Sequence, residues 1–218
     1  CLQDEIADHT LKMLRGAMAE CRMGNPGRLT TDIGPVIDSE AKANIERHIQ
    51  TMRSKGRPVF QAVRENSEDA REWQSGTFVA PTLIELDDFA ELQKEVFGPV
   101  LHVVRYNRNQ LPELIEQINA SGYGLTLGVH TRIDETIAQV TGSAHVGNLY
   151  VNRNMVGAVV GVQPFGGEGL SGTGPKAGGP LYLYRLLANR PESALAVTLA
   201  RQDAKYPVDA QLKAALTQ

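Results

Sequence analysis

The sequence predicts an α/β fold built on an open, mostly parallel twisted sheet with helices on both faces. From Val100 onward, short apolar runs alternate with helical segments of about ten residues, a pattern typical of βαβ units and a parallel sheet. Right-handed crossovers between such strands place helices on both faces. The composition, with 42% hydrophobic and 22% charged residues, is ordinary for a globular protein.

Two amphipathic helices are expected in the first quarter of the chain. Asp4 and Gly24 are the expected N-cap and C-terminal stop of the first helix, and Ser39 and Gly56 those of the second. Apolar residues at spacings of three and four give each helix one buried face: Ala7, Leu11, Leu14, Met18 and Cys21, then Ala41, Ile45, Ile49 and Met52. Cys21 is therefore interpreted as a small buried side chain.

Extended runs and helices then alternate along the chain. We expect strands at 58–63 and 78–86, a helical turn at 89–94, a strand at 100–106, a helix at 111–120, a strand at 125–131, a helix from Thr131 or Asp134 through Val140, and a strand at 146–151. Pro81 interrupts the second strand. Because proline cannot donate a ladder hydrogen bond, that strand is expected to be an edge or bulged strand.

A glycine-rich segment spans residues 146–180 and holds about half of the chain's 21 glycines. Long loops inside compact domains are usually functional. This segment carries too many apolar and too few charged side chains for a disordered linker. It also follows the carboxyl end of a predicted parallel strand, where open α/β sheets bind ligands. We therefore expect a packed, ligand-facing loop, followed by an apolar helical segment at residues 181–187.

Charge and composition exclude several classes of function. A net charge of −3 and a pI near 6.0 give no electrostatic basis for binding nucleic acid. No transmembrane helix or signal peptide is expected. Two cysteines, Cys1 and Cys21, fit a reducing cytoplasm. His48 has no partner at metal-ligand spacing, so we expect no metal site and interpret it as a surface or hydrogen-bonded histidine.

Both ends of the sequence look cut. The chain does not begin with Met, and residues 210–218 form an amphipathic fragment without a cap. We therefore expect that it is processed or is a piece of a longer protein. Residues 194–199 are expected to form a lone strand, which needs to pair with another part of the chain or with another subunit.

A series of motifs identifies a family resemblance. In order, these are Glu95-Val96-Phe97-Gly98-Pro99-Val100, residues 124–129, residues 147–153, and Pro164-Phe165-Gly166-Gly167 with Ser171-Gly172. The series resembles the C-terminal half of the catalytic domain of NAD(P)-dependent aldehyde dehydrogenases, over nearly the whole chain. Residues 157–167 and 178–180 resemble the L-glutamate γ-semialdehyde (pyrroline-5-carboxylate) dehydrogenases. The tail from Tyr184 to residue 204 resembles the bacterial bifunctional proline-utilisation proteins.

The resemblance implies an activity for the full-length protein. It is the NAD-dependent oxidation of L-glutamate γ-semialdehyde to L-glutamate in proline catabolism, through a thiolate that adds to the aldehyde and a thioester that water hydrolyses. The proline-utilisation proteins fuse this enzyme to an FAD-dependent proline dehydrogenase, and some add a DNA-binding repressor segment. The partners implied are the semialdehyde, the rest of the polypeptide and a homo-oligomer, with peripheral membrane association of the full protein left open.

Five residues match functional positions of the family. Glu95 corresponds to the carboxylate that accepts hydrogen bonds from the nicotinamide ribose, and Phe97 to the aromatic ring beside it. Gly157 and Ala158 correspond to a loop whose backbone N–H groups bind the α-carboxylate of the substrate, since consecutive main-chain donors form an anion cradle. Phe165 corresponds to the aromatic side chain that packs along the aliphatic part of the substrate.

The resemblance departs from the family at the nucleophile. No Gly-Gln-x-Cys motif is present, and Cys1 aligns a few residues past the family's nucleophilic cysteine, so we interpret Cys1 as structural. The general base and the nucleotide-binding glycines are also missing. The chain alone is therefore predicted to be inactive. Residues 1–190 are expected to be a catalytic domain incomplete at its N-terminus, and residues 191–218 an oligomerisation strand with the start of a following segment.

Two alternatives remain at this stage. The first is an N-terminal-nucleophile hydrolase that uses Cys1 activated by its own amine. That fold is built on stacked antiparallel sheets, which the predicted βαβαβ order does not favour. The second is a non-catalytic α/β module that binds phosphate through its glycine loop. The sequence holds no GxxxxGK[ST] motif, and no GxGxxG that follows a strand and opens a helix.

Overall fold

A computed structural model describes residues 1–62, 76–155, 162–172 and 174–187. The chain divides into two units, which are described separately: residues 1–122 with 132–144, and residues 123–131 with 145–218. The first unit contains β1 (Leu2–Gln3), α1 (Asp4–Glu20), α2 (Ser39–Ser54), β2 (Val59–Gln61), β3 (Thr82–Leu86), η1 (Phe89–Glu91), β4 (Val100–Tyr106), η2 (Arg108–Gln110), α4 (Leu111–Ala120) and α5 (Asp134–Ser143). The second contains β5 (Tyr123–Gly124), β6 (Thr126–Val129), β7 (Asn148–Val151), β8 (Glu168–Gly169) and η3 (Leu183–Leu186).

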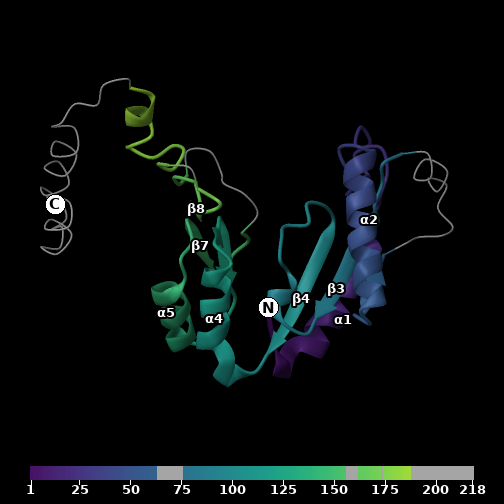
Figure 1. Cartoon of the computed structure of the whole chain (residues 1–218), viewed down its shortest axis with the longest axis horizontal. Coiled ribbons are helices and arrows are strands. Elements are labelled where there is room, and N and C mark those ends of the chain that lie inside the picture. The colour runs from purple at the N-terminus through teal and green to yellow at the C-terminus, as the bar shows by residue number, and fades with distance from the viewer. Residues whose placement is uncertain (63–75, 156–161, 173, 188–218) are drawn as a thin grey trace, which may run out of the picture. The chain divides into compact units, whose positions relative to one another are not determined.

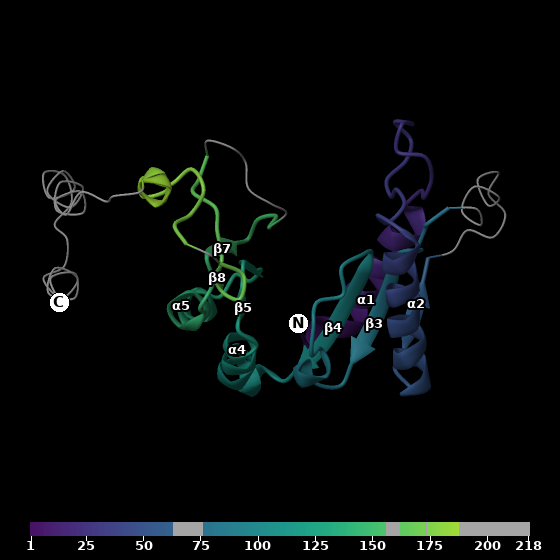
Figure 2. The ribbon, with the colours of Figure 1, turned by 45° about the horizontal axis from the view of Figure 1, so that its top comes forward.

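The first unit is organised around a four-stranded sheet with the order β1-β4-β3-β2. Strand β4 runs parallel to β1 and β3, whereas β2 is antiparallel to β3. Helices α1 and α2 flank β3 and β4 in Figures 1 and 2. The predicted α/β class, with an open and mostly parallel sheet and helices on both faces, is confirmed.

Helix α1 covers one face of this sheet. Leu11 of α1 is buried against Leu83 of β3 and Val103 of β4, and Leu14 and Met18 extend the contact. Alternate residues of a strand point to opposite faces, so Leu83 and Val103 belong to this side only. The predicted apolar stripe of α1 is confirmed.

Helix α2 covers the opposite face. Its residues Ile45, Ile49 and Met52 are buried against Ile84 of β3 and Val104 of β4. The i, i+4, i+7 spacing of the three helix residues is the reason that they share one face.

Three helix ends differ from the sequence prediction. The N-cap of α1 is Gln3, not Asp4, and its side chain makes no capping bond. Helix α1 ends at Glu20 because Cys21 is already extended, whereas Gly24 lies in a loop and donates to the Ile33 carbonyl. Cys21 itself is half-buried.

The N-cap of α2 lies one residue before the predicted Ser39. Asp38 accepts a 2.7 Å hydrogen bond from the Ala41 amide, which satisfies one of the free donors in the first turn. Gly56 follows the C-cap with φ of 78°, a conformation that favours glycine, so the predicted stop is confirmed.

The prediction that the strand after Pro81 is an edge strand was wrong. Strand β3 is central, bonded to β2 on one side and to β4 on the other. Pro81 lies just before its first residue, Thr82, where its missing N–H costs no ladder bond. Its carbonyl still accepts from the Ala62 amide at 2.9 Å. The proline therefore marks where β3 begins and does not interrupt it.

The expected single βαβαβ sheet is also not found among the described residues. Strand β4 is bonded to β3 on one edge and, at Arg105 and Tyr106, to β1 on the other, and β6 is not part of this sheet. In the second unit, β6 and β7 pair with each other in parallel, and β5 pairs with β8 in antiparallel. The strands and helices were predicted in the right order, and the predicted parallel pairing of β6 with β7 across α5 is confirmed, but the predicted continuation from β4 to β6 is not found.

Two predictions concern the end of the chain. The apolar helical segment at residues 181–187 contains only a short 3₁₀ turn, η3, whose Leu183 and Leu186 are 73% and 71% exposed. The strand expected at residues 194–199 lies outside the described residues. Within those residues, no helix has the length and apolar content that crossing a membrane requires.

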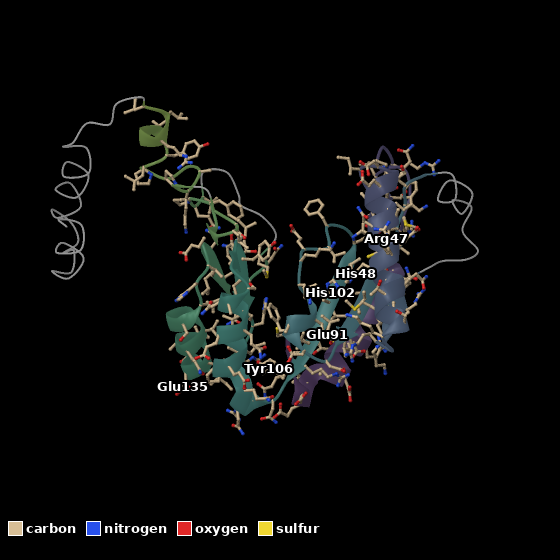
Figure 3. The ribbon with its side chains drawn as sticks, in the orientation of Figure 1. Arg47, His48, Glu91, His102, Tyr106 and Glu135 are labelled. Carbon is tan, nitrogen blue, oxygen red and sulfur yellow. The ribbon has the colours of Figure 1, made fainter. Side chains whose placement is uncertain are left out.

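Two histidines meet in the contact between α2 and the sheet. Nε2 of His48 on α2 lies 2.8 Å from Nε2 of His102 on β4, so one ring donates a hydrogen bond to the other (Figure 3). His102 follows Val100 and precedes Val104 on the face that α2 covers. Burial first, and then the charge of His48, lower the pKa of His102 to about 4. Burial, with Lys55 and Lys94 nearby, also lowers the pKa of His48.

The histidine pair predicts that the first unit loses stability in mild acid. The folded-state pKa of His102 is below its unfolded value of about 6.5, so the folded state binds fewer protons. Stability is then complete above pH 6.5 and falls as the pH drops toward about 4. Because the ring is only half-buried, we expect a loss of about 1–2 kcal/mol, measured by chemical denaturation across this range.

The His102→Leu variant tests the origin of that loss. Leucine continues the apolar row between Val100 and Val104, so the pH dependence between 6.5 and 4 should become flatter. His9→Gln, at an exposed histidine on α1, is the matched control and should keep the wild-type profile. An unchanged profile in His102→Leu would show that other groups cause the acid sensitivity.

Candidate functional site

Glu95 and Phe97 lie on the connection that leads into β4. Both side chains are exposed, that of Phe97 by 85%. Val96, between them, packs against the hydrophobic cluster formed by α2 and the sheet. The half-buried valine therefore fixes the turn while its two neighbours present a carboxylate and an aromatic ring to the outside.

The start of this connection is fixed by η1. Glu91 accepts a 3.0 Å hydrogen bond from the Asp87 amide and completes a capping box with Asp88. The other Glu91 oxygen accepts from Nε of Arg57 at 3.0 Å, and Arg57 also pairs with the Asp87 carboxylate. Glu91 is labelled in Figure 3. Arg57 thus links the first part of the connection to the segment between α2 and β2, a role that no sequence pattern indicated.

The end of the connection is fixed by a close approach to α2. A Cβ atom on Gly98 would lie only 2.4 Å from Cδ1 of Ile45, so no larger residue fits without a shift. The next residue, Pro99, accepts a 2.9 Å hydrogen bond from the Thr82 amide at the start of β3. Glycine at position 98 therefore lets the Glu95–Phe97 turn lie directly against the core.

Phe165 lies in the second unit, in the loop after β7. Its N–H donates to the Ala177 carbonyl at 3.0 Å, and its carbonyl accepts from the Ala177 amide at 2.8 Å. The phenyl side chain is half-buried. Gly157 and Ala158, the other predicted substrate residues, lie outside the described residues.

Strand β7 and the segment just after it supply side chains that hold the loop around Phe165. Nε2 of Gln163 donates to the hydroxyl oxygen of Tyr150 at 2.6 Å, and the Tyr150 side chain is buried. The guanidinium of Arg153 lies over the Tyr150 ring, 4.9 Å from its centre. Asn148 contacts the backbone on both sides of Phe165. The sequence motifs included these residues, but nothing in the pattern indicated their roles.

Strand β7 ends at Val151, and the side chain of the next residue, Asn152, makes two hydrogen bonds of the kind that a paired backbone would make. Its Oδ1 accepts from the Thr131 amide and its Nδ2 donates to the Thr131 carbonyl, both at 2.9 Å. Its φ of 52° is a left-handed conformation that asparagine tolerates better than most residues. The chain therefore turns out of the sheet at its carboxyl end, where the glycine-rich loop begins.

The described residues bring Glu95 and Phe97 together in the first unit and place Phe165 in the second. No group of three or more His, Cys, Asp or Glu side chains in the described ranges could hold a metal ion. An exposed carboxylate such as that of Glu95 can accept hydrogen bonds from ligand hydroxyls, and an exposed aromatic ring such as that of Phe97 can pack on a flat group. The sheet of the first unit is mostly parallel and covered by helices, unlike the stacked antiparallel sheets that the Cys1 hydrolase alternative requires.

Comparison with known proteins places this architecture in one family. The model of the aldehyde dehydrogenase family matches residues 1–188. The chain is 90% identical over 216 residues to the bifunctional protein PutA of Salmonella typhimurium, covering 99% of this chain but 16% of that protein. It is 38% identical over 182 residues to 1-pyrroline-5-carboxylate dehydrogenase 1 of Halalkalibacterium halodurans, covering 83% of this chain and 33% of that protein.

Solved structures agree with the sequence relatives. A crystal structure of Bradyrhizobium japonicum proline utilization A superposes with a TM-score of 0.75 at 49% identity, covering 83% of this chain and 18% of that chain. Betaine aldehyde dehydrogenase from Staphylococcus aureus superposes with a TM-score of 0.69 at 28% identity, covering 80% of this chain and 34% of that chain. The chain therefore spans between 16% and 34% of the length of these relatives.

The contact between Gly98 and Ile45 yields a testable prediction. Gly98→Ala should destabilise the first unit by about 1–3 kcal/mol, because Ile45 is 2% exposed in a packed core and has little room to move. Ile45→Val removes only Cδ1, the atom that lies 2.4 Å away, and leaves Cγ1 at 3.3 Å. Denaturation of both single variants and the double variant measures the coupling between the two sites.

Ile45→Val alone should cost about 0.5–1.5 kcal/mol. The double variant should be more stable than the sum of the two single losses predicts. Strictly additive losses would mean that the Gly98→Ala effect does not come from contact with Ile45.

Proposed function

Because the chain belongs to the aldehyde dehydrogenase family, we propose that it forms part of an NAD-dependent dehydrogenase that oxidises L-glutamate γ-semialdehyde to L-glutamate in proline catabolism. The names of its relatives, PutA and 1-pyrroline-5-carboxylate dehydrogenase, support this substrate. The observation that carries the proposal is the Glu95–Phe97 turn. It presents a carboxylate and an aromatic ring outward while Val96 and Gly98 fix it to the core.

NAD is the proposed cofactor, and it accepts the hydride of the aldehyde when bound. In this proposal the Glu95 carboxylate accepts hydrogen bonds from the nicotinamide ribose hydroxyls. The Phe97 ring packs beside the ribose and the nicotinamide. Both side chains are exposed on a turn with two fixed ends, so they can meet a ligand without rearrangement of the fold.

The second unit is proposed to bind the aldehyde substrate. Backbone N–H groups at Gly157 and Ala158 would hold its α-carboxylate, as consecutive main-chain donors do for anions. Phe165, fixed to Ala177 by two backbone hydrogen bonds, would pack along the aliphatic part. A short chain that ends in a carboxylate and an aldehyde fits these two contacts.

The rest of the dehydrogenase is proposed to lie in sequence that the relatives carry outside the matched region. That sequence would supply the nucleophilic cysteine and the general base and, in a bifunctional protein, the FAD-dependent proline dehydrogenase. Residues 1–190 would then be the catalytic part present here, and residues 191–218 an oligomerisation strand with the start of a following segment. A cytoplasmic homo-oligomer is the proposed working form.

The role of Glu95 predicts the behaviour of Glu95→Gln in the complete dehydrogenase. The amide loses the negative charge that accepts ribose hydrogen bonds. We expect a loss of about 1–3 kcal/mol, seen as weaker NAD⁺ binding or slower hydride transfer. Titration of NAD⁺ and single-turnover kinetics separate the two effects. Glu116→Gln, at an exposed position on α4, is the matched control, and wild-type kinetics in Glu95→Gln would refute the assignment.

The proposed carboxylate anchor predicts substrate choice. Glutamate semialdehyde should be a far better substrate than butanal, which has no carboxylate to bind. Gly157→Val should raise the KM for the semialdehyde with less effect on NAD⁺ binding, because its side chain would obstruct the backbone donors. Steady-state kinetics with both aldehydes checks this, and equal kcat/KM values for butanal and the semialdehyde would contradict the anchor.

A further inference from the structure

We propose that Asn148 is a positioning residue for Phe165, whose side-chain amide holds the backbone of Phe165 in place from strand β7. The inference rests on the proposed function, since that proposal gives Phe165 its contact with the substrate. It adds a residue that acts through Phe165 and does not touch the substrate itself.

The side-chain amide of Asn148 forms hydrogen bonds with both chain neighbours of Phe165. Nδ2 donates to the Pro164 carbonyl at 3.0 Å, and Oδ1 accepts from the Gly166 amide at 3.2 Å. The side chain therefore makes the pair of hydrogen bonds that a neighbouring strand would make along one edge of an extended segment.

The opposite edge of the same segment is also satisfied. The N–H and carbonyl of Phe165 itself pair with Ala177 at 3.0 and 2.8 Å. Four backbone groups at and around Phe165 are thus hydrogen-bonded, two by Ala177 and two by Asn148. With both edges fixed, the direction in which Phe165 leaves the backbone is fixed as well.

The support behind this contact is rigid. Asn148 and Tyr150 are two residues apart on β7, so their side chains point to the same face of the strand. The Tyr150 hydroxyl accepts a hydrogen bond from Gln163, two residues before Phe165. A Cβ atom on Gly147 would lie 1.8 Å from the Gly166 carbonyl oxygen, so strand and loop pack backbone to backbone there. Lys176 also donates from Nζ to the Gly147 carbonyl.

Asparagine is the short side chain that fits both contacts. Aspartate keeps an acceptor for the Gly166 amide but places a negative oxygen against the Pro164 carbonyl. Leucine has a similar size and supplies neither donor nor acceptor. The two substitutions therefore remove one or both of the hydrogen bonds with little change in volume, and their effects should rank in that order.

The experiment measures kinetics of the complete dehydrogenase that contains this chain. In Asn148→Leu, kcat/KM for glutamate semialdehyde should fall by about tenfold to a hundredfold, as expected for a misplaced substrate contact, and NAD⁺ affinity should be unchanged. Asn148→Asp should lie between Leu and wild type. Asn119→Ala, which removes a different side-chain bond to a backbone carbonyl, on α4, is the matched control and should match wild type.

The decisive measurement repeats Asn148→Leu in a Phe165→Ala background. If Asn148 acts through Phe165, its effect should shrink to less than about threefold there, because contacting residues are not additive. A purely structural role would leave the effect of Asn148→Leu undiminished, and that result would overturn the proposal. If Asn148→Leu fails to fold, Asn148→Asp with and without Phe165→Ala gives the same decision.

The outcomes also separate this proposal from the proposed function. A wild-type enzyme that is active on the semialdehyde, with Asn148 variants that match it, overturns the positioning role alone. A wild-type enzyme without activity on the semialdehyde overturns the proposed function and the positioning role with it.

Discussion

The burial of β3 on both faces is the constraint on which the first unit depends. Leu83 and Ile84 are fully buried, one beneath α1 and the other beneath α2. A strand in this position needs partners for its backbone groups: β4 pairs with it from Thr82 to Leu86, β2 pairs with it from Thr82 to Ile84, and the Pro58 carbonyl accepts from the Glu85 amide. Thr82, the buried polar residue of this strand, uses its hydroxyl to donate to the Ala80 carbonyl at 2.8 Å. The two helices can then pack on opposite faces of a strand whose hydroxyl and ladder groups are hydrogen-bonded, and the buried polar atom left without a hydrogen bond among the described residues is Nε of Arg15 on α1.

The proposed cofactor contact is built from the edge of this core. Val96 is part of the α2 cluster, and Gly98 approaches Ile45 of the same helix closely. The Arg57–Glu91 pair fixes the other end of the connection. A short exposed turn is thereby held at both ends by buried or half-buried contacts. Such a turn can present Glu95 and Phe97 in a defined geometry, which reduces the ordering cost when a ligand binds.

In the second unit, asparagine side-chain amides hold the backbone in a defined geometry, as Val96 and Gly98 do for the turn in the first. Asn152 replaces a backbone pair at the end of β7, and Asn148 replaces a neighbouring strand beside Phe165. A side-chain amide carries one acceptor and one donor group, the same set that a peptide unit offers. Around Phe165 and Thr131, these two side chains therefore satisfy backbone groups that a regular ladder would have paired.

The sequence alone determined the α/β class, the order of helices and strands, and the family, since apolar spacing and the motif at Glu95–Val100 are local features. It also determined where α4 and β4 begin and end. Only the tertiary structure decided that β3 is central despite Pro81, that β4 does not join β6, and that His48 meets His102. Strand pairing depends on which edges are free, and contacts such as Arg57–Glu91 or Asn148–Gly166 join residues whose spacing along the chain carries no periodic signal.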